Sequence, residues 1–158
     1  MDLSHNKITN HGIRLLTKLI GASSILTNLN LADNQIHAEV TSQHEGILGL
    51  VLQGGRYLGR ALRVNDSLLS VNVRLNRLID DGGRALLEGL HGNRALTNIN
   101  LSANSLGSMA ASSLVTFLAH PLSSLCSLDI SCNNLIDRDF ELIAQALINN
   151  TVLSSIVP

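Results

Sequence analysis

This sequence contains few aromatic residues, and its basic and acidic residues are nearly equal in number. Its 158 residues include one tyrosine, two phenylalanines and no tryptophan. A stacking platform for single-stranded nucleic acid needs several aromatic side chains, and binding to phosphate backbones needs an excess of lysine and arginine. The chain carries 11 basic and 12 acidic residues, for a net charge of -1. These shortages predict a protein that binds neither nucleic acid nor an acidic membrane surface.

Cysteines and long apolar runs are scarce as well. Cys126 and Cys132 are the only cysteines, too few for the disulfide framework of a small secreted domain. No apolar run reaches the roughly 18 residues of a membrane-spanning helix, and no basic segment followed by an apolar one opens the chain. We therefore expect a reduced, cytoplasmic protein with no membrane partner.

Motifs that carry chemistry are missing too. The sequence contains neither a phosphate-binding loop motif nor a two-histidine zinc-protease motif. Its six histidines and two cysteines do not have the spacing of metal ligands. The sequence therefore predicts no catalytic residue, cofactor, metal ion or small-molecule substrate, and hence a protein that is not an enzyme.

The sequence does contain an internal repeat. Five segments share alternating apolar residues followed by an asparagine: MDLSHNKI, LNLADNQI, VNVRLNRL, INLSANSL and LDISCNNL. The asparagines are Asn6, Asn34, Asn76, Asn104 and Asn133. The intervals between them are 28, 42, 28 and 29 residues, and three of these match the period of leucine-rich repeats, which is about 20–29 residues. We expect short strands with inward leucines, and a structural asparagine ladder that satisfies the backbone where the chain leaves each strand.

The segments between these strands have the apolar spacing of helices. Residues 82–93, GGRALLEGLHGN, predict a helix that ends at Asn93. In the last copy we expect Asp139 to cap the helix. The apolar residues of these two helices are Ala85, Leu86, Leu87 and Leu90, then Phe140, Ile143, Ala144 and Leu147. A glycine six residues into the repeat, at positions 12, 54 and 82, predicts close packing of the helix start on the strand end.

These patterns predict an α/β solenoid in which residues 1–158 form a single domain of about five leucine-rich repeats. Six parallel strands would line the concave face and five helices the convex face. Neither end of the sequence carries a polar capping repeat, which such stacks need. We therefore expect the chain to be a segment of a longer repeat protein.

The interval of 42 residues contains an insert. Removing residues 40–53, VTSQHEGILGLVLQ, brings the flanking repeats back into register. Three interpretations are open: a loop on the convex side, a partner-binding element, or a retained in-frame intron. The first places the insert where solenoid insertions usually lie, and the second accounts for the apolar residues Ile47, Leu48, Leu50, Val51 and Leu52, which are unusual in a loop. Sequencing the transcript across this region would separate the third from the others.

Two surfaces are candidates for binding another protein. On the concave sheet, polar residues alternate with the leucines, and a charged and an apolar side chain interrupt them, as binding hot spots often do. The concave candidates are Asn72, Arg74, Leu75, Asn100 and Asp129. On the helical side, Arg14, Arg56 and Arg84 share one repeat position and would form a basic stripe. The simpler interpretation of both surfaces is that they are only solvated.

The consensus LxLxxNxL and the repeat length resemble the ribonuclease-inhibitor type of leucine-rich repeat along essentially the whole chain. A narrower likeness lies in NVRLNRLIDDGGRALLEGL and LTNINLSAN, which resemble the T-complex-associated testis-expressed family, the leucine-rich-repeat subunit of the nexin–dynein regulatory complex. This resemblance implies a structural scaffold in the link between microtubule doublets of motile cilia or flagella. The implied partners are other subunits of that complex.

Two alternatives belong to other functional classes. One is a Ran-type GTPase activator or a related regulatory fragment, which a long acidic tail after the repeats and stimulation of a GTPase would indicate. The other is the sensor repeat of an immune receptor, which requires a nucleotide-binding domain upstream. The sequence shows neither feature.

Overall fold

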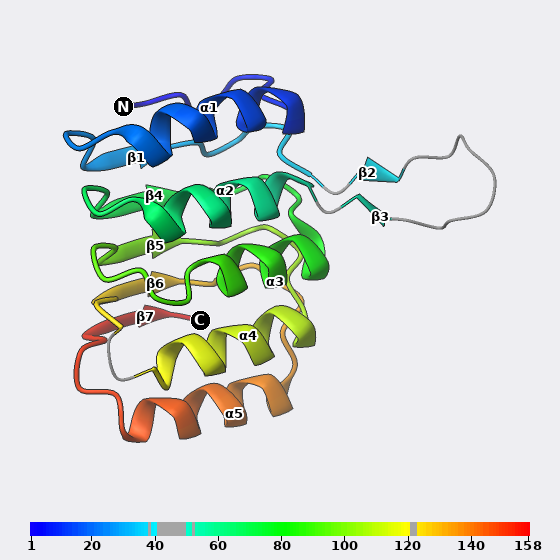
Figure 1. The fold of residues 1–158 in the computed structure, drawn as a ribbon. Helices are drawn as coiled ribbons and strands as arrows, with labels where there is room; N and C mark the ends of the chain where they lie inside the picture. Colours follow the sequence, from blue (N-terminus) through cyan, green and yellow to red (C-terminus); the bar gives the residue numbers. More distant parts are fainter. Residues whose placement is uncertain (38, 41–49, 52, 121–122) are drawn as a thin grey trace.

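The computed structural model describes residues 1–37, 39–40, 50–51, 53–120 and 123–158. The helices are α1 (Asn10–Ala22), α2 (Gln53–Val64), α3 (Ile79–Gly89), α4 (Ser108–Leu118) and α5 (Asp137–Ile148). The main sheet contains β1 (Asn28–Asn30), β4 (Ser70–Asn72), β5 (Asn98–Asn100), β6 (Ser127–Asp129) and β7 (Ser155–Val157), in that order. Strands and helices form two layers that stack along one axis (Figure 1).

The sheet is parallel and its register follows the repeat. The central residues Leu29, Val71 and Ile99 pair in succession across β1, β4 and β5, and the same row continues into β6 and β7. Each strand therefore occupies the same place in its repeat. This arrangement confirms the predicted α/β solenoid.

The core lies between the sheet and the helices and is almost entirely aliphatic. Leu29, Val71, Ile99 and Leu128 are at most 3% exposed. Leu62, Leu86, Leu90, Leu114, Ile143 and similar residues cover them from the helical side. Each repeat presents an apolar face to its neighbours, so stacking supplies burial that one repeat could not obtain alone.

The helices α2 and α3 approach closely because glycines face each other between them. A Cβ on Gly55 would lie 2.0 Å from the Gly82 carbonyl oxygen, and one on Gly89 would lie 2.4 Å from the Gly59 Cα. These contacts join neighbouring helices.

The predicted packing of a helix start on a strand end is found at two of the three glycines. A Cβ on Gly54 would lie 2.5 Å from the Ile36 Cγ2, and one on Gly12 would lie 2.9 Å from the Ile8 Cγ2. At Gly82 the prediction is wrong, because a Cβ there would meet nothing closer than the Leu78 Cβ at 3.5 Å.

Four details of the sequence prediction need correction. The first repeat contributes an isolated bridge between Asp2 and Asn30 instead of a sixth strand of the main sheet. The helix expected at 82–93 begins at Ile79 and ends at Gly89. Asp139 lies inside the first turn of α5, because that helix begins at Asp137. Ala144 is exposed and Phe140 is 36% exposed, since only α4 packs against α5 among the described helices.

The insert begins and ends as an antiparallel hairpin. Its strands are β2 (Glu39–Val40) and β3 (Leu50–Val51), with Glu39 opposite Val51. Gln53, which the sequence placed in the insert, is the first residue of α2. The hairpin projects away from the stack between α1 and α2 (Figure 1). The insert residues 41–49 and 52, including Ile47, Leu48 and Leu52, lie outside the described residues.

Candidate functional site

The chain turns sharply where each strand ends, along an edge that we call the strand-to-helix edge (residues 3–9, 31–37, 73–79, 101–107 and 130–136). Asn76 is fully buried there. Its Nδ2 donates to the carbonyls of Leu31 (2.8 Å), Val73 (3.0 Å) and Arg74 (3.2 Å). Its Oδ1 accepts the Ile36 N–H at 3.3 Å. One amide side chain thus satisfies backbone groups of two adjacent repeats.

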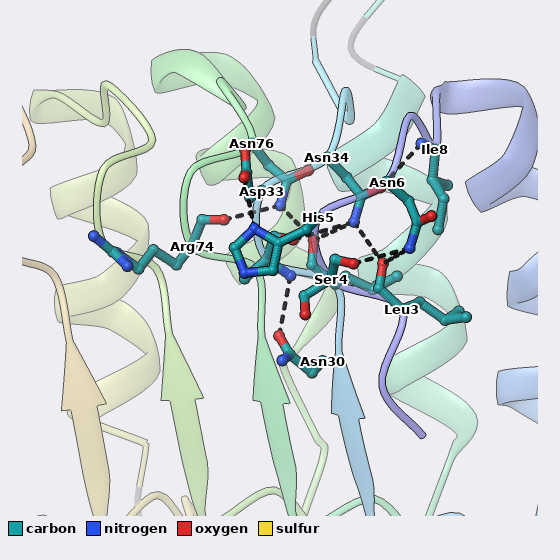
Figure 2. Close-up of polar contacts among 12 residues, drawn as sticks. Leu3, Ser4, His5, Asn6, Ile8, Asn30, Asp33, Asn34, Arg74 and Asn76 are labelled. Atoms are coloured by element: carbon teal, nitrogen blue, oxygen red, sulfur yellow. Dashed lines mark hydrogen bonds and ion pairs between the residues drawn. The ribbon is translucent and has the colours of Figure 1, made fainter.

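The other four asparagines occupy the same position. Asn34, Asn104 and Asn133 each donate to carbonyls of their own repeat and of the preceding one. Asn6 is exposed and bonds only within its own repeat. Figure 2 shows Asn6, Asn34 and Asn76 side by side in this ladder. The predicted asparagine ladder is therefore present, and its role is structural.

A second ladder runs along the opposite edge, where each helix leads into the next strand. Asn93 donates to the carbonyls of Leu62 and Asn65 and accepts the N–H groups of Ala95 and Leu96. Asn65 and Asn150 make equivalent bonds in their own repeats. The sequence indicated only that Asn93 ends a helix. The alignment of Asn65 with Asn93 was the available signal for a ladder.

Three of the predicted concave-face binding residues also support the backbone. The Oδ1 atoms of Asn72, Asn100 and Asp129 accept the N–H two residues further along the chain, at 2.9–3.0 Å. Asn100 also donates to Asp129 at 2.9 Å. In the first repeat, the N–H and hydroxyl of Ser4 lower the pKa of Asp2 below its usual value. This column shapes the sheet surface and leaves fewer polar atoms for a partner.

Arg74 and Leu75 differ from the rest of this face. Arg74 is exposed, and within the described residues its guanidinium has no hydrogen bond or ion pair. Figure 2 shows its side chain extending away from His5 and Asp33, which form a pair of their own at 2.8 Å. Leu75 is 45% exposed, and its φ of 57° is shared by the residues at the same position of the other repeats. The structure thus places an unpaired cation beside an exposed leucine.

A hollow of about 630 Å³ opens beside Leu75 on the strand-to-helix edge. One wall comes from the third repeat and contains Leu75, Arg77 and Ile79. The other wall comes from the first two repeats and contains Asn6, Asp33, Asn34, Gln35 and His37. The sequence did not predict this hollow.

One repeat of the chain matches a known protein family. A family model described as a leucine-rich repeat matches residues 64–87. These residues include β4, the Asn76 turn and most of α3. The chain folds as a leucine-rich-repeat solenoid. Among curated proteins, no sequence matches the chain.

The basic stripe of this leucine-rich-repeat solenoid is uneven. Arg14 and Arg56 are exposed on α1 and α2 and have no ion pair within the described residues. Arg84 instead pairs with Asp81 at 3.4 Å and with Glu88 at 3.1 Å. The acidic neighbours neutralise one third of the expected stripe, and binding by the stripe stays a prediction.

Across the described residues, no three or more histidine, cysteine, aspartate or glutamate side chains gather where they could hold a metal ion. Within the same ranges, no helix combines the length and the apolar character that crossing a membrane requires.

Proposed function

We propose that this leucine-rich-repeat solenoid is a non-enzymatic scaffold that binds other proteins. Its contact surface is centred on Arg74 and Leu75, on the concave side where the sheet meets the strand-to-helix edge. A stack of repeats supports such a surface well because its concave face is extended and held by many equivalent contacts.

The observation that carries this proposal is the unpaired guanidinium of Arg74 beside the 45%-exposed Leu75. Arginine is enriched among binding hot spots, where neighbouring contacts exclude water from it. Burial of the exposed leucine would add a hydrophobic contribution. The remaining residues of the face are small or polar, and several of them already bond the backbone. They would therefore surround the two anchors without competing with them.

We further propose that the scaffold works in the nexin–dynein link of motile cilia or flagella, with other subunits of that complex as partners. Support comes from the resemblance of residues 72–90 and 96–104 to the repeats of the linking subunit. Within that run, Arg74 and Leu75 are exposed whereas Asn76 and Leu78 are buried. The resemblance thus covers both the repeat framework and the proposed contact residues.

The first experiment tests the surface. Tagged wild-type protein and the Arg74→Glu variant would be cross-linked in the source cell and their partners compared. Arg138→Glu makes the same charge change on exposed Arg138 of α5, outside the concave face, and is the matched control. We expect the wild-type partners to be lost from Arg74→Glu and kept by Arg138→Glu. Equal partner sets for all three proteins would contradict the surface assignment.

The second experiment tests the cellular setting. The tagged full-length gene product would be localised, and the cells extracted with detergent. We expect retention along a cilium or flagellum after extraction. A diffuse signal, or a source cell that never builds a cilium, would contradict the axonemal proposal and leave the binding surface to be judged by the first experiment.

A further inference from the structure

The hollow beside Leu75 has two chemically different walls. Leu75 and Ile79 give the third-repeat wall an aliphatic surface, and Arg77 adds a cation to it. Arg77 is exposed, and its guanidinium has no hydrogen bond or ion pair within the described residues. Arg74 precedes Leu75 and has an equally unpaired guanidinium. The unpaired guanidinium groups therefore belong to residues on either side of Leu75 in the sequence.

The backbone of this wall is held in an uncommon conformation. Leu75, Arg77 and Ile79 have φ values of 57°, 53° and 52°. The first two belong to the turn of the repeat, since His5, Asp33, Ala103 and Cys132 share the conformation of Leu75 and Ser105 shares that of Arg77. Among the described residues, the conformation of Ile79 is the one that departs from the repeat. A positive φ is disfavoured for residues with a Cβ, and most strongly for a β-branched residue such as isoleucine. The residues that align with Ile79 at two other helix starts, Gly107 and Ile136, have negative φ values. Backbone strain of this kind gathers at binding sites, where the surrounding structure maintains it.

The opposite wall of the hollow carries a carboxylate, so the two walls differ in charge. Asp33 contributes a carboxylate whose Oδ2 lies 2.8 Å from the Nδ1 of His5. Asn34 is buried, and its side chain is occupied by the ladder. A negatively charged ligand group is therefore repelled from the Asp33 side and attracted to the Arg77 side.

We propose that the hollow binds an extended acidic segment of a partner protein, with an aliphatic side chain lying between acidic residues. The aliphatic side chain enters the hollow against Leu75 and Ile79. One neighbouring carboxylate pairs with Arg77 and the other with Arg74. This inference rests on the proposed scaffold function and specifies the chemistry of the partner. Charge complementarity carries it, because both arginines are unpaired and the one carboxylate in the hollow already has a partner.

The test uses a fluorescent peptide of alternating aspartate and leucine, and matched peptides with asparagine or lysine in place of aspartate. Binding to the full chain would be followed by fluorescence polarisation at low and at physiological salt. We expect the aspartate peptide to bind about tenfold more tightly than the asparagine peptide, because each lost charged hydrogen bond weakens binding by about this factor or more. The preference should shrink as salt is added.

The decisive variant is Arg77→Asn, since asparagine tolerates a positive φ and the turn should keep its shape. We expect it to weaken binding of the aspartate peptide about tenfold and to leave the asparagine peptide unaffected. The control is Arg94→Asn, which removes an exposed arginine from the opposite edge. Circular dichroism of both variants would verify that they remain folded.

Each other outcome overturns the inference in a distinct way. If the aspartate and asparagine peptides bind equally, or if neither binds, the hollow does not select acidic segments. Tighter binding of the lysine peptide would mean that Asp33 determines the specificity. Binding that survives Arg77→Asn but is lost in Arg74→Glu would place the peptide on the sheet alone. The partner comparison with Arg74→Glu judges the scaffold function independently of all these results.

Discussion

The backbone N–H of Asn76 donates to the Oδ1 of Asn104 at 3.1 Å, so one ladder asparagine holds the backbone of another. Asn104 donates in turn to the Oδ1 of Asn133 at 3.0 Å. Asn76 and Asn104 therefore each bind the repeat on either side. These bonds add to the aliphatic packing, the sheet and the second ladder, which also join the repeats.

Removing a central member should destabilise the protein strongly. Asn76→Ala leaves the buried Ile36 N–H without its acceptor and removes one of the two ladder bonds to each of the Leu31 and Val73 carbonyls, which keep a bond from a neighbouring ladder asparagine. We expect the free energy of unfolding to fall by about 2–4 kcal/mol, because an unsatisfied buried group costs about 1–3 kcal/mol and a lost hydrogen bond about 1 kcal/mol. Equilibrium unfolding in guanidinium chloride measures this loss.

The matched control is Asn6→Ala at the exposed end of the same ladder. Its side chain bonds only the carbonyls of Leu3 and Ser4, both accessible to water. The expected loss is below about 1 kcal/mol, since water replaces those bonds. Equal losses for the two variants would mean that burial does not determine the contribution of a ladder asparagine.

Asp80 should stabilise the helix of the next repeat. Its carboxylate accepts the N–H groups of Gly107 (2.9 Å), Met109 (3.1 Å) and Ala110 (2.7 Å) at the start of α4. Asp80→Ala should lower the free energy of unfolding by about 1–2 kcal/mol, as the loss of a helix cap does. Hydrogen exchange should quicken at those three amides. Asp81→Ala, which removes a part-exposed ion pair with Arg84, should change stability by less than about 1 kcal/mol.

Replacing glycine by alanine should have opposite effects on the free energy of unfolding at two positions on facing helices. Gly55→Ala places a Cβ 2.0 Å from the Gly82 carbonyl oxygen, which forces α2 and α3 apart. We expect a loss of about 2–3 kcal/mol from this overpacking. Gly82→Ala meets nothing closer than the Leu78 Cβ at 3.5 Å. It should stabilise α3 by about 0.5–1 kcal/mol, since alanine is the better helix former. Thermal unfolding of both variants would show whether this opposition holds.

Asp2 should titrate below the usual range of an aspartate. The N–H and hydroxyl of Ser4 stabilise its carboxylate and lower its pKa. Because the folded-state pKa is the lower one, this contribution to stability is present above the unfolded pKa and is lost as the pH falls through the folded pKa. NMR titration of Asp2 in wild type and Ser4→Ala measures it. We expect Ser4→Ala to raise the pKa, and an unchanged value would contradict the assigned cause.

The strand periodicity and the asparagine ladder could be predicted from the sequence because each is local and repeats. Leu29, Val71 and Ile99 reveal the period through their spacing alone, and Asn76 follows at a fixed distance. The hydrogen-bond partners of Asp139 could not be predicted in this way. It looks like a cap at the start of its helix, yet it accepts the Ile136 N–H from within the first turn and a bond from Ser108 of the preceding repeat.

The candidate site could be predicted only in part. Arg74 and Leu75 interrupt a polar column, so the sequence indicated them. The hollow beside them is lined by residues of three repeats, and a β-branched residue such as Ile79 gives no sign of its positive φ. Whether Arg84 is paired depends on Asp81 and Glu88 one turn away on α3, and the alignment of repeats does not reveal that pairing.

The paired ends of the hairpin have a practical consequence for protein engineering. Because Glu39 lies opposite Val51, the chain leaves the stack and returns to it at nearly the same point. The distance that the insert spans is therefore independent of its length. This position can accept a grafted epitope, a reporter domain or a sensor loop while β1 and β4 keep their pairing.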